Sequence, residues 1–205
     1  PVIATFHYYE PMFFTHQGAA WTEPIYGTTG VSWPGPPQTP IIPCQAALNN
    51  LWASWWFEAY NTLPLYENPA GYGPIVERLE TAAKWSRANG IPIWLGEFGS
   101  IQTADLSSRA NWTGFVCRES ERLNIDWAYW DFCAAFAAFD LDLRDAHGVV
   151  PFGLAVEAQD LGGRVAQAAA DGEIRMLWIA CTNPEPAFPA APWPNRVVSS
   201  FASHA

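Results

Sequence analysis

Residues 91–99, Ile-Pro-Ile-Trp-Leu-Gly-Glu-Phe-Gly, decide the fold class of this chain. The apolar run 91–95 predicts a short buried strand, and the residues after it place the carboxylate of Glu97 at the C-terminal end of that strand. Glycines beside Glu97 allow a ligand to approach the backbone closely and favour a rigidly held carboxylate. The stretch therefore predicts a strand that delivers one acidic side chain to a site.

Helical patterns lie on both sides of this strand. Residues 75–89 carry apolar or small residues at helical spacing, including Trp85, with Pro74 in the first turn and Gly90 at the stop. A second helix is predicted over 106–123. Further strands are predicted over 2–9 and 125–132. This alternation of strands and helices predicts the α/β class with a parallel sheet.

Three polar or aromatic side chains follow the predicted strands at their C-terminal ends. Tyr9, Glu97 and Trp130 occupy these positions. In an α/β barrel the catalytic residues project from the C-terminal strand ends, so we expect the three to converge on one face. Residues 22–43 are rich in Pro, Gly and Thr and predict a long surface loop.

The composition limits the classes of partner. Twenty acidic residues against ten basic ones give a formal charge of −10, so we expect neither nucleic acid nor membrane as a partner. Twelve Trp, seven Tyr and twelve Phe make the chain aromatic. Any single Trp is better explained as core, but the set favours stacking on sugars. Four widely spaced cysteines predict buried thiols and no metal or cofactor, while one disulfide remains open.

Several motifs together resemble one family. They are 6–11 (Phe-His-Tyr-Tyr-Glu-Pro), 14–19 (Phe-Thr-His-Gln-Gly-Ala) with Trp21, 93–99, and 127–132 (Trp-Ala-Tyr-Trp-Asp-Phe). In this order they resemble the sixth, seventh and eighth strands of glycoside hydrolase family 5, which includes many cellulases. The resemblance covers residues 1–140 and implies a partial (β/α)8 TIM barrel with about the last three strands.

The resemblance implies a retaining mechanism and a role for each site residue. Glu97 would be the nucleophile, while a second carboxylate about 5 Å away would act as acid and then as base. His7 would hydrogen-bond in the −1 subsite, Tyr9 would contact the nucleophile or the sugar, and Trp130 would lie beneath the −1 sugar. Taken alone, Glu97 would fit a strand-end ion pair, and His7 and Trp130 would fit ordinary core.

The acid/base glutamate is not found in this sequence. The family places it after an Asn on the fourth strand, and no Asn-Glu dipeptide occurs among the 205 residues. The chain also begins inside an apparent strand, without initiator Met or signal peptide. These features predict a fragment that is inactive alone. Secretion or a periplasmic location is expected from the polymeric substrate class.

Residues 141–205 differ in character from the preceding part. Ala and Gly dominate there, and 169–184 are weakly similar to a segment of molybdopterin oxidoreductases. We therefore expect an atypical tail, foreign or fused, after a family 5 portion at 1–140. The resemblance favours hydrolysis of β-1,4-glucan. The alternatives are a non-catalytic carbohydrate-binding protein, a β-mannanase specificity and, from the tail alone, a molybdopterin oxidoreductase fragment.

Overall fold

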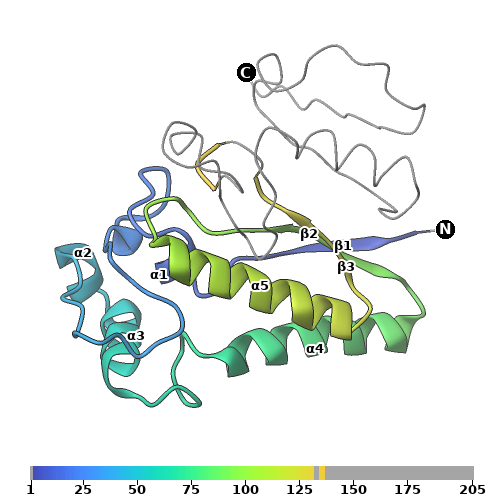
Figure 1. Cartoon of the computed structure of the whole chain (residues 1–205), viewed down its shortest axis with the longest axis horizontal. Coiled ribbons are helices and arrows are strands. Elements are labelled where there is room, and N and C mark those ends of the chain that lie inside the picture. Colours follow the sequence, from blue (N-terminus) through green and yellow to red (C-terminus); the bar gives the residue numbers. More distant parts are fainter. Residues whose placement is uncertain (1, 132–133, 137–205) are drawn as a thin grey trace, which may run out of the picture. The chain divides into compact units, whose positions relative to one another are not determined.

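The computed structural model describes residues 2–131 and 134–136 (Figure 1). It divides into two compact units, residues 1–127 and 128–205. The predicted boundary at residue 140 and the predicted tail lie outside the described residues. The elements are β1 (Ala4–Tyr8), α1 (Met12–Thr15), the 3-10 helix η1 (Pro24–Tyr26), α2 (Gln45–Leu48), α3 (Leu51–Thr62), α4 (Tyr72–Asn89), β2 (Ile93–Phe98), α5 (Leu106–Arg122) and β3 (Asp126–Tyr129).

The sheet has three strands in the order β1-β2-β3. β1 and β2 are parallel, and their pairing runs from Ala4 opposite Ile93 to Tyr8 opposite Phe98. α4 precedes β2 and α5 precedes β3, and the two helices run side by side along the sheet (Figure 1). The predicted α/β class and the predicted three strands are confirmed.

The two long helices begin and end where their sequences indicate. Gly90 has a left-handed φ of 63° and ends α4, as its place after the helical pattern predicts. The Asp105 side chain accepts a hydrogen bond from the Ser108 N–H at 2.9 Å and caps α5. The prediction that Trp85 belongs to the apolar stripe of α4 is wrong, since this side chain is 46% exposed. The buried face of α4 follows the i, i+4 series that includes Ile75 and Leu79 instead.

Trp112 of α5 is the largest fully buried side chain of the described residues. Its ring lies 6.2 Å from that of Tyr8 at the end of β1 and 6.1 Å from that of Phe98 at the end of β2. Its indole N–H donates to the Glu10 carbonyl at 3.1 Å. One side chain thus packs against both strand ends and also binds the turn that follows β1.

A second aromatic cluster joins α1 to α3, a helix that the sequence did not predict. The Phe13 ring lies 4.6 Å from Trp56, 4.9 Å from Phe57 and 5.1 Å from Trp52. Trp56 also stacks on Tyr60 at 5.1 Å with an interplanar angle of 13°. This cluster packs α3 against the chain just beyond the end of β1.

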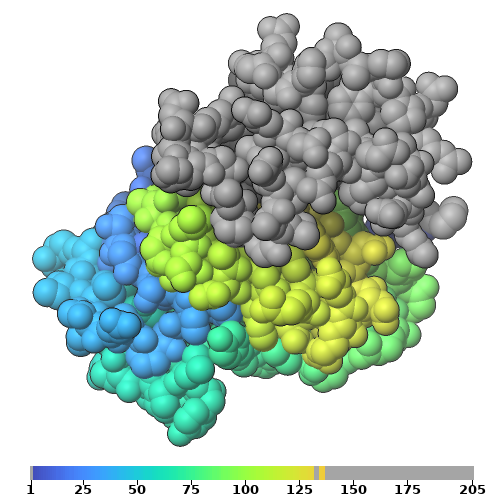
Figure 2. Space-filling model, viewed as in Figure 1, coloured from blue at the N-terminus to red at the C-terminus, as the bar shows by residue number. Residues whose placement is uncertain are grey.

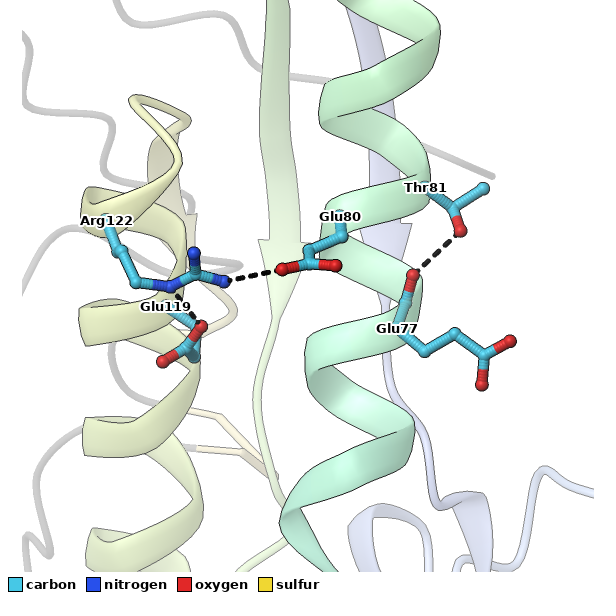
Figure 3. Close-up of polar contacts among 5 residues, drawn as sticks. All are labelled: Glu77, Glu80, Thr81, Glu119 and Arg122. Atoms are coloured by element: carbon cyan, nitrogen blue, oxygen red, sulfur yellow. Dashed lines mark hydrogen bonds and ion pairs between the residues drawn. The ribbon is translucent and has the colours of Figure 1, made fainter.

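Two ion pairs that share Arg122 join α4 and α5 at the surface (Figure 3). The Arg122 guanidinium reaches Glu80 of α4 at 3.2 Å and Glu119 of its own helix at 2.8 Å. Glu77 and Thr81, also drawn there, belong to α4 and share a hydrogen bond from the Thr81 hydroxyl to the Glu77 carbonyl. Solvent screening keeps such exposed ion pairs weak, so they contribute little to stability.

Two of the four cysteines lie in the described part of the chain, and both are free thiols. Burial raises the pKa of the Cys117 thiol to about 12. Cys133 and Cys181 lie outside the described residues. Across residues 2–131 and 134–136, no three His, Cys, Asp or Glu side chains come together as a metal site requires. None of the helices in this range combines the length and apolar character needed to cross a membrane.

Candidate active site

Glu97 is the fifth of six residues in β2 and projects near the C-terminal end of that strand. The register of the sheet places His7 of β1 opposite it. The His7 Nδ1 atom lies 3.3 Å from Glu97 Oε2, and the two side chains are 51% and 30% exposed. A carboxylate and an imidazole therefore meet in an open, solvent-accessible position.

Tyr9 contacts the same carboxylate oxygen. Its hydroxyl donates to Glu97 Oε2 at 3.0 Å from a position one residue beyond β1. In the described part of the chain, no hydrogen bond reaches Glu97 Oε1. The two contacts therefore fix the orientation of the carboxylate through one oxygen and leave the other for a ligand.

The pairing of β1 and β2 is irregular next to this site. Phe6 pairs with Leu95 and His7 pairs with Glu97, so Gly96 is an extra residue between the two pairs. A Cβ atom on Gly96 would lie 2.5 Å from the Thr5 hydroxyl oxygen. The sequence predicts that the glycine beside Glu97 lets a ligand approach, but at Gly96 the Thr5 side chain of the neighbouring strand takes up this space. This close approach lets the bulge bring His7 level with Glu97.

Tyr9 is itself held by two residues of the following turn. The Thr15 hydroxyl donates to the Tyr9 carbonyl, and the His16 ring packs edge-on against the Tyr9 ring at 5.0 Å. Thr15 Oγ1 also lies 2.9 Å from His16 Nδ1. Because the single hydroxyl proton goes to the carbonyl, Nδ1 carries the imidazole proton and donates to Thr15. Burial lowers the pKa of His16, which favours this neutral form.

Sequence reasoning gave no role to Thr15 or His16. Both belong to the quoted motif 14–19, so the signal was present in the sequence. Their effect on Tyr9 depends on a turn that the motif alone does not reveal. They act on the carboxylate only through Tyr9.

Trp130 follows β3 and is half-buried. It belongs to the unit 128–205, whereas Glu97 belongs to the unit 1–127. The structure therefore brings together His7, Tyr9 and Glu97 of the four predicted site residues. The role of Trp130 as a sugar platform stays a prediction.

Glu10 lies close to the site in sequence, but its carboxylate faces another way. Its Oε2 atom accepts a hydrogen bond from the Met12 N–H at 3.3 Å, at the start of α1. Its backbone carbonyl accepts the bond from Trp112 described above. Glu10 therefore has a local structural role in the turn after β1.

A glutamate at the C-terminal end of a parallel strand lies where barrel enzymes carry their catalytic residues. Residues 1–136 match the family model described as Cellulase (glycosyl hydrolase family 5), and the chain belongs to this family. The family membership expected from the motifs is thereby confirmed.

Two curated relatives are endoglucanases. Endoglucanase 3 of Fibrobacter succinogenes is 26% identical over 142 residues, which make up 68% of this chain and 21% of the relative. Endoglucanase C of Acetivibrio thermocellus is 32% identical over 133 residues, 64% of this chain and 36% of the relative. The chain thus spans about a fifth to a third of the length of the curated relatives it matches.

Solved structures give similar matches. Endoglucanase Cel5A of Thermotoga maritima is 34% identical, with a TM-score of 0.48. The matched region makes up 67% of this chain and 34% of the Cel5A chain. Structures of the same enzyme are described in complex with mannotriose and with cellobiose; each is 33% identical, with a TM-score of 0.47, over 68% of this chain and 34% of that one.

Proposed function

We propose that this chain is part of a retaining glycoside hydrolase that cleaves β-1,4-glucan, with Glu97 as its nucleophile. The observation that carries this proposal is the pair of contacts from Tyr9 and His7 to one oxygen of Glu97. They hold a partly exposed carboxylate in one orientation at a strand end, which is what in-line attack on a sugar carbon requires.

The reaction proceeds in two steps. Glu97 Oε1 attacks the anomeric carbon as the glycosidic C–O bond breaks, and a second carboxylic acid protonates the leaving oxygen. Water, deprotonated by that second carboxylate, then attacks the same carbon and releases Glu97. Tyr9 and His7 keep their hold on Oε2 throughout, so the ester forms through the other oxygen.

The second carboxylate is supplied from outside this sequence, since the Asn-Glu pair of the family is absent from it. Of the acidic residues near the site, Glu10 is bound to the Met12 N–H. We therefore propose that the 205-residue chain has no turnover alone, because general acid catalysis is missing.

The glucan specificity is supported by the names of the relatives, which are endoglucanases. A mannan specificity is the second candidate, because a relative has been solved with mannotriose as well as cellobiose. A polymeric substrate of either kind cannot enter a cell, and we propose a secreted or periplasmic protein on this ground. A carbohydrate-binding protein without catalysis is the remaining alternative.

The test compares the chain alone with the chain joined to an N-terminal half-barrel that carries the Asn-Glu strand. Reducing-sugar release from carboxymethyl-cellulose and from β-mannan is measured for both. We expect no release by the chain alone and release from the cellulose substrate by the joined enzyme. Turnover by the chain alone would contradict the missing acid, and faster release from mannan would favour the second specificity.

Replacing Tyr9 by Phe is expected to lower kcat/KM of the joined enzyme about ten- to a hundredfold. The change removes one hydrogen bond to a charged acceptor and leaves the ring packing on His16 in place. Tyr72→Phe on α4 is the matched control and is expected to keep full activity. If Tyr9→Phe matches the control, the hydroxyl has no part in holding Glu97.

A further inference from the structure

A hollow lies where α3 ends and α4 begins, and neither Glu97 nor the residues that contact it line this hollow. Its volume is about 420 Å³, and its lining includes Trp55 of α3, Tyr66 and Glu67 of the connecting loop, and Gly73 and Glu77 of α4. Figure 2 shows the loop between these helices as the projection at the lower edge of the molecule. The Trp55 and Tyr66 side chains are 58% and 80% exposed.

Asn68 fixes the loop that carries Tyr66. This buried side chain donates to the carbonyls of Tyr60 and Leu63, both at 2.9 Å, and accepts from the Ala70 N–H at 3.0 Å. The loop is therefore bound to the last turn of α3 and returns to the start of α4. Such a preorganised surface loses little conformational entropy when a ligand binds.

The lining of the hollow matches one ligand chemistry. Two exposed aromatic rings offer flat apolar faces, and the carboxylates of Glu67 and Glu77 offer hydrogen-bond acceptors. No Lys or Arg lines the hollow, so an anionic ligand is disfavoured. A β-linked glucose unit combines flat C–H faces with a rim of hydroxyl donors, which is the complement of this surface.

We propose that the hollow is a second, non-catalytic binding site for a β-glucan chain. The choice of glucan as the sugar rests on the proposed function, whereas the site itself rests on its lining. The hollow contains none of the residues that contact Glu97, so binding there is independent of hydrolysis. It holds polysaccharide on the enzyme surface while another segment reaches the nucleophile.

Three variants test this proposal by calorimetric titration with cellohexaose. Trp55→Ala removes one ring, and Gly73→Gln fills the hollow from a helical position where an added Cβ meets no atom within 4 Å. Trp85→Ala removes another exposed Trp side chain, on the part of α4 that does not line the hollow, and is the control. We expect the first two to weaken binding about five- to tenfold and the control to bind like the unaltered chain.

Binding is also measured with mannohexaose as a second ligand. Trp55→Ala and Gly73→Gln are expected to keep the kcat of the joined enzyme on a short soluble cello-oligosaccharide, which separates this site from the nucleophile. No measurable binding, or equal affinity in all variants, would overturn the proposal. So would binding of mannohexaose in preference to cellohexaose. If Glu97→Gln does not abolish turnover in the joined enzyme, the proposed function is wrong, whereas the proposal for this second site is unaffected.

Discussion

Replacing Glu97 by Gln is expected to lower turnover of the joined enzyme by at least about a thousandfold. The amide has nearly the shape of the carboxylate and can still accept from Tyr9, but it cannot form the covalent bond to the anomeric carbon. Loss of a nucleophile removes the whole covalent route and not one contribution to it. The measurement is kcat on a soluble cello-oligosaccharide, with unfolding curves to show that the fold is kept.

Two further variants make this result specific. Glu121→Gln changes an exposed glutamate of α5 and is expected to leave kcat unaltered. Glu97→Ala opens space for azide, which would attack from the face that the carboxylate occupied and give a glycosyl azide of inverted configuration. A product of retained configuration would instead assign Glu97 as the acid/base residue.

Replacing Trp112 by Ala is expected to cost about 3–5 kcal/mol of unfolding free energy. The side chain is fully buried and contacts Tyr8 and Phe98 at the two strand ends. The change also removes the hydrogen bond to the Glu10 carbonyl. Because domains of this size are stabilised by only about 5–15 kcal/mol, we expect the Tm to fall by about 10 °C or more. Urea denaturation of the 205-residue chain measures the loss.

Trp112→Phe separates packing from hydrogen bonding. It keeps most of the buried aromatic volume but loses the indole N–H, so we expect a loss of about 1–2 kcal/mol. Trp85→Ala, at a side chain 46% exposed, is expected to cost less than about 1 kcal/mol. An equal loss in Trp112→Ala and Trp85→Ala would show that Trp112 does not support the strand ends.

The fold was predictable where the apolar residues of the sequence follow one clear pattern. The run before Glu97 and the helix ending at Gly90 placed β2 and α4 correctly, although the predicted bounds differ from the observed ones by two or three residues. α3 was missed because its twelve residues, Leu-Trp-Ala-Ser-Trp-Trp-Phe-Glu-Ala-Tyr-Asn-Thr, are apolar on nearly every side. In this helix Leu51 is 89% exposed whereas Tyr60 is fully buried, and the 3.6-residue spacing of apolar residues does not predict which of the two is buried.

Three of the four predicted site residues lie together in the structure, but the backbone features that bring them together were not predictable. His7, Tyr9 and Glu97 came from strand ends and motifs, and the structure places their side chains in contact. The bulge at Gly96 arises because β1 and β2 approach closely there. The sequence of either strand alone does not show this approach. The support of Tyr9 by Thr15 likewise depends on a turn. Roles in catalysis remain predictions for the experiments above.

The aromatic cluster between α1 and α3 gives the molecule an optical signature. Trp56 lies nearly parallel to Tyr60 at 5.1 Å and is tilted by 41° against Phe13. Aromatic rings held in fixed packing contribute circular dichroism in the near ultraviolet, a signal that disappears when side-chain packing loosens. Excitation of Tyr60 also passes to Trp56 at this distance. The packing of this region can therefore be followed spectroscopically, without an activity assay.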